Sequence, residues 1–284
     1  DELLVERARH AGVEVLEESV VTGLVMERSA VHGVTFKSRN GETSEIRAKL
    51  TVDATGRTRS LSRRVESKDT RRSAAKHVAF KTHLRGASVG PGTCEIYVYR
   101  GGYGGCNRVE NDLYNLCFIA SAVDTKRLES DPERIMRELV FSNVRARAAM
   151  EHATVAKPWL AVPIERFGRG DLVPAEGLIT VGDSAAFIDP FTGSGILLAL
   201  ESGKIAAAEI AESFAKGRDF SDLARNYRSR YSSAFDSRLR VCSVLRNAAF
   251  IPLLAETVIS VLSINERLRR RLAQATRFSA GSAS

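Results

Sequence analysis

The sequence contains few cysteines, and none of them forms a CxxC pair. The four are Cys94, Cys106, Cys117 and Cys242. This spacing excludes a zinc ribbon and a thioredoxin-type redox motif, so we interpret the cysteines as packing residues of a protein from a reducing compartment. Proline is also scarce, at 7 residues beside 21 glycines, which excludes a collagen-like chain and low-complexity disorder.

Long apolar runs are missing as well. No uncharged apolar stretch reaches about 18 residues, the length that a membrane-spanning helix needs. No leader with a charged, an apolar and a small-residue part opens the chain. We therefore expect a folded cytoplasmic protein, and its 284 residues predict about two domains.

The excess positive charge is confined to one end of the chain. Residues 216–284 hold 13 Lys and Arg against 5 Asp and Glu, which accounts for the whole net charge of +8. A basic tail of this kind fits an acidic partner, a membrane surface or a solvated helix face. Because the rest of the chain is balanced, we do not expect nucleic acid as a partner.

Two local patterns are clear near the start of the sequence. Residues 1–11 have the apolar spacing of a helix, and Gly12 follows where a helix C-cap belongs. Asn40-Gly41 then lies between two extended segments, 31–36 and 43–46, and predicts a β-hairpin.

A short apolar strand over 50–53 runs into Ala54-Thr55-Gly56 and a cationic segment that begins with Arg57. Small residues at the end of a strand allow a ligand to approach the backbone, and nearby arginines suit phosphate. A strand-to-helix corner with a solvated basic face is the alternative.

The middle of the chain is predicted to be an antiparallel sheet. Four of the residues 101–105 are glycine, but no helix follows them, so they indicate a bulge or close backbone approach instead of a nucleotide loop. Ser130 begins a capping box for a helix to 141 or beyond, and 159–167 is again extended. The expected strands cover 76–84, 93–100, 103–110 and 113–121.

The most informative region runs from residue 177 to 214. Residues 178–181 have the pattern of a buried parallel strand, Gly182-Asp183 ends it, and a helix follows from Ser194. We expect its apolar stripe at Ile196, Leu200, Gly203, Ala207, Ile210 and Phe214. Amides at the helix start would attract an anion or a ligand oxygen, and Asp183 at a strand end could accept hydrogen bonds from sugar-like hydroxyls. A cap for the next turn is the structural alternative for Asp183.

Residues 182–195, together with 52–56, resemble the FAD-dependent oxidoreductases of the para-hydroxybenzoate hydroxylase fold. The stretch 189–196, followed by Ser202-Gly203, is most similar to the geranylgeranyl reductase branch and somewhat less to flavin-dependent halogenases. The resemblance implies an α/β protein with α+β elements. It contains a three-layer ββα FAD-binding domain, incomplete at the N-terminus, with an antiparallel substrate-domain sheet and C-terminal helices. The implied domains are 1–72 and 168–215 for FAD, 73–167 for substrate, and 216–284 for the basic helices.

The resemblance also implies a cofactor, FAD, and the residues that hold it. Asp183 would bond the ribityl chain, Pro190 would lie beside the isoalloxazine, and the amides of Gly193 to Gly195 would face its pyrimidine edge. The helix start would stabilise negative charge on the reduced flavin. The predicted cofactor-binding set is Asp53, Gly56, Arg57, Gly182, Asp183, Pro190, Thr192, Gly193, Ser194, Gly195 and Ile196, with Arg59 as a further candidate beside the pyrophosphate. Tyr103 and Trp159 are the candidate substrate-lining residues. No metal site is expected, and no side chain is assigned as a catalytic acid or base.

The chain departs from this family in one respect, because the GxGxxG unit that opens such proteins is absent. We therefore hypothesise an amino-terminally truncated chain that binds FAD weakly or not at all. A single tryptophan and the absence of a WxWxIP pattern disfavour a tryptophan halogenase, while other halogenase types stay open.

The tail is predicted to form two or three helices. Residues 223–245 carry a helical apolar stripe, and Ser263 caps a further basic helix. The apolar stretch 250–262 lies between them. It could cover a substrate pocket, pack in the core or make peripheral contact with a membrane beside the arginines.

Three functions remain open at this point. The first is an FAD enzyme that reduces a carbon–carbon double bond of an apolar, isoprenoid-like substrate, with NAD(P)H or a separate reductant as electron donor. The second is an FAD-dependent monooxygenase or halogenase that acts on an aromatic or polyketide substrate. The third is a non-catalytic fragment or scaffold.

Overall fold

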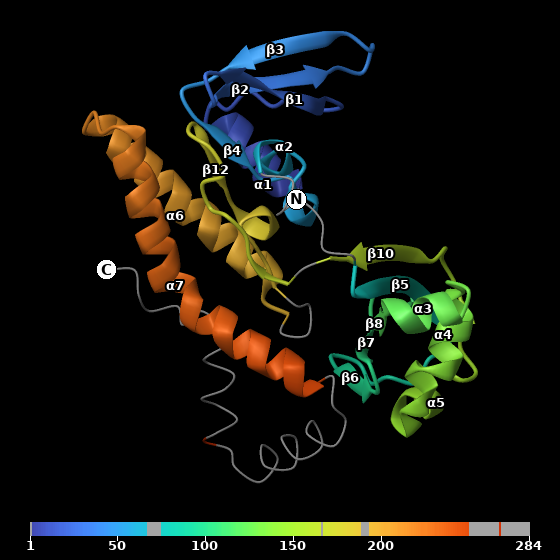
Figure 1. The fold of residues 1–284 in the computed structure, drawn as a ribbon. Helices are drawn as coiled ribbons and strands as arrows, with labels where there is room; N and C mark the ends of the chain where they lie inside the picture. Colours follow the sequence, from blue (N-terminus) through green and yellow to red (C-terminus); the bar gives the residue numbers. More distant parts are fainter. Residues whose placement is uncertain (1, 67–74, 166, 189–192, 250–266, 268–284) are drawn as a thin grey trace.

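A computed structural model describes residues 2–66, 75–165, 167–188, 193–249 and residue 267. Figure 1 shows a layered α/β part and, beside it, a second sheet that carries short helices on one face. The expected Pro190, Thr192, apolar stretch 250–262 and helix cap at Ser263 lie outside the described residues.

The layered part has the predicted three-layer ββα arrangement (Figure 1). An antiparallel meander forms one outer layer, a short parallel strand pair lies in the middle, and two long helices form the other outer layer. The meander consists of β1 (Val20–Glu27), β2 (Ala30–Lys37) and β3 (Thr43–Arg47). The middle pair is β4 (Thr51–Asp53) and β12 (Leu178–Thr180), and the helices are α6 (Gly195–Ala215) and α7 (Phe220–Ala249).

The second part is the predicted antiparallel sheet, with strand order β10-β5-β8-β7-β6 and β9 paired to β5. Its helices cover the face that bears Phe80, Phe118 and Tyr97, and together they bury the largest core cluster. The strands are β5 (His77–Arg85), β6 (Cys94–Tyr99), β7 (Gly102–Arg108), β8 (Tyr114–Ser121), β9 (Thr154–Val155) and β10 (Leu160–Ile164). The helices are α3 (Ala122–Arg127), α4 (Pro132–Glu138) and α5 (Val144–Met150).

Short elements connect these parts. The N-terminal helix ends near Gly12, which has φ +87° and so acts as the predicted helix stop. The remaining short elements are α1 (Glu2–His10), the 3₁₀ turns η1 (Gly56–Thr58), η3 (Val140–Ser142) and η4 (Gly182–Ser184), α2 (Ser62–Val65), β11 (Gly168–Arg169) and β13 (Ala186–Phe187).

Helix α7 packs into the core of the layered part. Its side chains at Leu223, Tyr227, Tyr231 and Phe235 are almost completely buried, as the predicted stripe requires. They belong to the same cluster as Ile179 of β12 and Leu198 of α6. The predicted boundary at residue 215 therefore falls between two helices that share one core.

The predicted apolar stripe of α6 is wrong. Ile196, Leu200 and Phe214 are 82%, 50% and 53% exposed, whereas small and polar residues form the buried face. The buried set is Leu198, Ser202, Ala206, Glu209 and Ser213. Small side chains permit close packing against the neighbouring elements, and the buried Glu209 is paired with Arg218 and Arg230. Burial here follows packing space and ion pairing, so hydrophobicity alone points to the wrong face.

Three smaller expectations also need correction or refinement. The cap of α4 is Asp131, whose side chain accepts from the amides of Glu133 and Arg134, and not Ser130. The predicted hairpin forms, but Lys37 pairs with Thr43, so five residues form its loop. The glycine-rich stretch lies in β7 as expected, since a Cβ at Gly102 would lie 2.0 Å from the Ile119 carbonyl oxygen.

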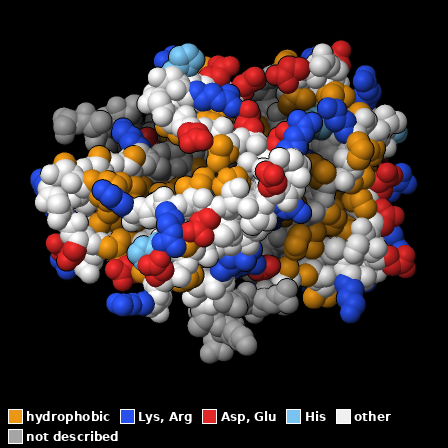
Figure 2. Space-filling view, turned by 90° about the horizontal axis from the view of Figure 1, so that it is seen from above, with side chains coloured by type: hydrophobic (Ala, Val, Ile, Leu, Met, Phe, Trp, Pro, Cys, Tyr) orange, Lys and Arg blue, Asp and Glu red, His pale blue; other side chains and the backbone are white. Residues whose placement is uncertain are grey.

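The surface carries both signs of charge. Figure 2 shows Lys and Arg interspersed with Asp and Glu over the face in view, with hydrophobic side chains between them. Within the described ranges, no helix is both long and apolar enough to span a bilayer.

Candidate functional site

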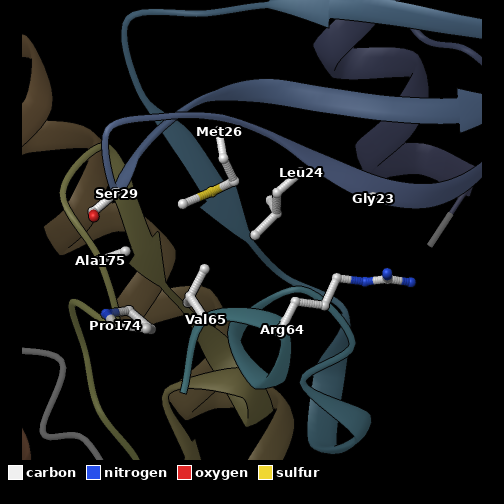
Figure 3. Close-up of a pocket in the computed structure, with 8 residues that line it drawn as sticks. All are labelled: Gly23, Leu24, Met26, Ser29, Arg64, Val65, Pro174 and Ala175. Carbon is white, nitrogen blue, oxygen red and sulfur yellow. The ribbon is translucent and has the colours of Figure 1, made fainter. Parts of the chain in front are cut away.

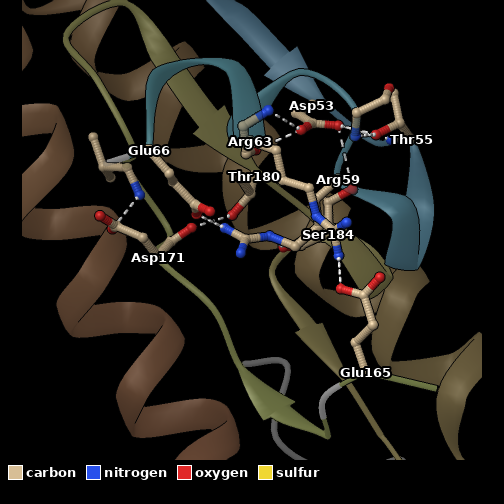
Figure 4. Close-up of polar contacts among 12 residues, drawn as sticks. Asp53, Thr55, Arg59, Arg63, Glu66, Glu165, Asp171, Thr180 and Ser184 are labelled. Carbon is tan, nitrogen blue, oxygen red and sulfur yellow. Dashed lines mark hydrogen bonds and ion pairs between the residues drawn. The ribbon is translucent and has the colours of Figure 1, made fainter. Parts of the chain in front are cut away.

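The site forms where the two middle strands end. Because β4 and β12 run in parallel, their carboxyl ends lie at one edge, and the Val181 amide donates to the Asp53 carbonyl at 3.1 Å. The turns η1 and η4 continue from these ends and contact each other. Gly56 and Arg57 are thereby brought beside Gly182 and Asp183, although more than 120 residues separate them in sequence. Figure 4 shows part of this junction.

Asp53 supports the junction from inside. Its carboxylate is completely buried and accepts from the amide and hydroxyl of Thr55, at 2.9 and 2.6 Å, and from those of Ser62, at 2.9 and 2.5 Å. The Ser184 hydroxyl also donates to it, at 3.2 Å (Figure 4). Burial raises the pKa of Asp53, but the hydrogen bonds from Ser62 and Thr55 outweigh it and leave the pKa below its ordinary value. The Asp53 carboxylate, which was predicted to bind the cofactor, thus accepts hydrogen bonds from other groups of the protein.

Asp183 presents the contrasting case. It lies within η4 and is partly buried, yet no hydrogen bond to its carboxylate is found among the described residues. Burial raises the pKa of Asp183, and the charge of Arg57 acts in the opposite direction. Arg57 itself donates to the Pro163 carbonyl at 3.0 Å. A partly desolvated carboxylate with free acceptor positions is suited to hydroxyl groups of a ligand.

Glycines leave open space around these turns. A Cβ added at Gly56, Gly193 or Gly195 would meet no heavy atom within 4 Å. Gly56 and Gly193 also have positive φ, +72° and +63°, which favours glycine. A ligand can therefore approach the backbone closely at η1 and in the segment just before α6.

The start of α6 lies on the chain shortly after η4, and the two elements contact each other. Ser194 is its N-cap residue, and the Ser194 side chain caps no amide of this helix. The first amides of any helix have no acceptor within the helix. Ile196 in this turn is 82% exposed. Orphan amides at the start of a long helix attract negative charge.

An apolar face of the second sheet adjoins this site. Tyr103, Ile119 and Ile164 form a buried cluster together with Phe167 and Phe187. The Phe167 and Phe187 rings are stacked with centroids 5.5 Å apart. Phe187 lies only four residues after Asp183, so this cluster links the sheet to the turn η4.

The two predicted substrate-lining residues lie on opposite faces of the sheet. Tyr103 is on the face just described. Trp159 packs edge-on against Phe118, 5.7 Å between centroids, in the core beneath the short helices. They therefore do not line one surface, and Tyr103 is the one of the two that belongs to the cluster with Phe187.

A separate pocket of about 650 Å³ lies between the meander, α2 and the residues before β12. Figure 3 shows Leu24, Met26 and Val65 in it, with Pro174 and Ala175 on one side. None of the residues predicted from the sequence lines this pocket.

Sequence reasoning missed the supporting side chains of the junction. Ser62 and Ser184 were not singled out, although each bonds Asp53 and Ser184 also donates to the Gly56 carbonyl at 2.9 Å. The contact partners lie 9 and 131 residues from Asp53. Only the three-dimensional pairing of β4 with β12 identifies them.

These features fit the flavin half of FAD. Asp183 offers an acceptor for ribityl hydroxyls, Gly56 and Gly193 leave the backbone open, and α6 provides amides for an anionic edge. Arg57 adds a positive charge beside the same turn.

Comparison with known proteins relates the chain to FAD-dependent proteins. The family model described as an FAD binding domain matches residues 2–85. The chain is 28% identical over 262 residues to digeranylgeranylglycerophospholipid reductase 1 of Methanococcoides burtonii, which covers 88% of this chain and 60% of the relative. It is 25% identical over 242 residues to a tryptophan 2-halogenase of Chondromyces crocatus, covering 83% and 46%.

The fold is likewise shared with solved flavoproteins. The flavin-dependent brominase Bmp2 aligns with a TM-score of 0.78 at 20% identity, over 99% of this chain and 70% of that one. The chain spans about 60% of the length of the reductase that it matches. These comparisons confirm the predicted relationship to FAD-dependent oxidoreductases and the predicted cofactor, FAD.

Proposed function

We propose that this chain, which is related to the FAD-dependent oxidoreductases of the geranylgeranyl reductase and halogenase branch, serves to reduce carbon–carbon double bonds of an apolar, isoprenoid-like substrate. The observation that carries the proposal is the apolar face around Tyr103 and Phe187, directly beside the Asp183 turn. A hydrocarbon substrate needs such a surface, because burying apolar groups supplies its binding energy.

Different residues would contact different parts of the flavin. Asp183 and Arg57 would orient the ribityl chain, and the α6 amides would stabilise negative charge at the edge of the ring. FAD, when bound, supplies the hydride chemistry. The half-buried rings of Phe167 and Phe187 would hold the double bond against the flavin ring and exclude water, and the buried side chains of Tyr103, Ile119 and Ile164 would support them.

A second candidate is oxygen-dependent chemistry on an aromatic or polyketide substrate. The 25% identity to a tryptophan 2-halogenase favours it, and so do the aromatic rings of Phe167 and Phe187 beside the site. A non-catalytic scaffold is the third, and it would not hold flavin.

Anaerobic turnover separates the candidates. The protein is mixed with FAD, dithionite as the reductant and a digeranylgeranyl lipid, and the products are analysed by mass spectrometry. In the absence of oxygen, we expect the lipid to gain the mass of two hydrogen atoms for each double bond that is reduced. The second candidate would replace this proposal if no reduced lipid forms and a product appears only when oxygen is present. That product would need added halide or an aromatic substrate.

A further inference from the structure

Arg59 occupies an unusual position between the two turns of the site. It directly follows η1 and has φ +49°, in the left-handed region that side chains other than glycine rarely adopt. Its side chain is only 13% exposed. A strained, buried arginine at this junction requires contacts that hold it there.

Those contacts reach from α2 to the Asp183 turn (Figure 4). The Arg59 Nε donates to the Ser184 carbonyl at 3.0 Å, and Nη2 donates to the Glu66 carboxylate at 2.5 Å. Glu66 is itself only 11% exposed. The guanidinium also lies against Gly170, where an added Cβ would be 3.0 Å from the Arg59 Cζ.

We propose that Arg59 is a positioning residue of the flavin site, which fixes the turn that presents Asp183. The inference rests on the proposed function, because it assigns Arg59 to the same site. Only arginine offers donors in a planar fork that can bind a carbonyl and a carboxylate together. Lysine keeps the charge but cannot make both contacts from this backbone position.

The neighbouring Arg63 provides a matched control. It forms an ion pair with Glu165 at 2.7 Å, and both side chains are 35% exposed. Its side chain donates to Glu165, and among the described residues we find no hydrogen bond from it to the Asp183 turn. Replacing Arg63 therefore removes a nearby arginine but leaves η4 unchanged.

Hydrogen exchange in the full chain tests the proposal independently of flavin. The reporters are the amides of Ala185, which donates to Gly182, and of Gly170, which donates to Ala185. We expect Arg59→Met and Arg59→Lys to speed their exchange about tenfold or more, the effect of losing a charge-assisted hydrogen bond. Gly170→Ala, which displaces the guanidinium, should act in the same direction. Amides of the β5–β8 sheet and the variant Arg63→Met should not change.

The FAD dissociation constant provides the second readout. We expect Arg59→Met and Arg59→Lys to weaken binding about tenfold, with Arg63→Met within about twofold. Unchanged exchange at Ala185 in both Arg59→Lys and Gly170→Ala, together with unchanged exchange at Gly170 in Arg59→Lys, would overturn the positioning role. If the wild-type chain binds no FAD while exchange changes as expected, the proposed function fails and the structural role of Arg59 stands.

Discussion

The carboxylate of Asp53 offers the sharpest test of the junction. Its two oxygens divide their partners: Thr55 and Ser184 donate to Oδ1, and the amide and hydroxyl of Ser62 donate to Oδ2. In Asp53→Asn one oxygen becomes an NH₂ group. The hydroxyls can rotate to accept, but one backbone amide, of Thr55 or Ser62, loses its acceptor. A buried amide without an acceptor, together with the loss of the negative charge, lowers the free energy of unfolding by about 2 to 3 kcal/mol.

Urea denaturation followed by circular dichroism measures this change. The control is Asp131→Asn, because Asp131 caps α4 through Oδ1 alone and asparagine caps equally well, so we expect a change within about 0.5 kcal/mol. The native pKa of Asp53 is lowered, so its stabilisation is present above the unfolded value of about 4 and is lost as pH falls below it. Equal stability of the two variants at neutral pH would refute the reasoning.

Three further predictions concern other positions. Asp183→Asn should raise the thermal midpoint at neutral pH while weakening FAD binding. Burial raises the pKa of Asp183, so its destabilising charge appears only as pH rises, and the gain should vanish below about pH 4. Lys216 and Arg230 lower the pKa of Glu212 to about 2; Glu212→Gln should therefore be less stable than wild type in urea at pH 7, with a difference that disappears as pH approaches that value. Gly102→Ala should cost about 3 kcal/mol in the same assay because of the close Ile119 carbonyl, whereas Gly90→Ala, with its nearest atom at 3.6 Å, should be nearly neutral.

Local patterns predicted much of the fold. The strands β5 to β8 were expected to within a residue or two, since turn residues separate successive extended segments. The Gly182-Asp183 turn and the helix that follows it were also expected in order. These features depend on neighbours in sequence, which periodicity and turn chemistry describe well.

Features that depend on pairing between distant segments were not predictable. The position of Trp159 against Phe118 depends on packing between segments about 40 residues apart, which no local pattern fixes. The buried face of α6 is set by close packing and by the Glu209 ion pairs, and the exposed Ile196 contradicts simple hydrophobicity. Asp53 drew attention for its motif, but its engagement by Ser184 needed the β4–β12 junction.

Asp183 and Arg57 are proposed to hold the flavin half of FAD, and a titration of the protein with FAD, followed by the quenching of flavin fluorescence, measures this directly. We expect saturable binding that weakens about tenfold in Asp183→Ala and in Arg57→Ala, the loss expected for one hydrogen bond or ion contact to a ligand. Asp131→Asn should bind like wild type. The absence of saturable binding, or equal affinity in all four proteins, would contradict the assignment of this site.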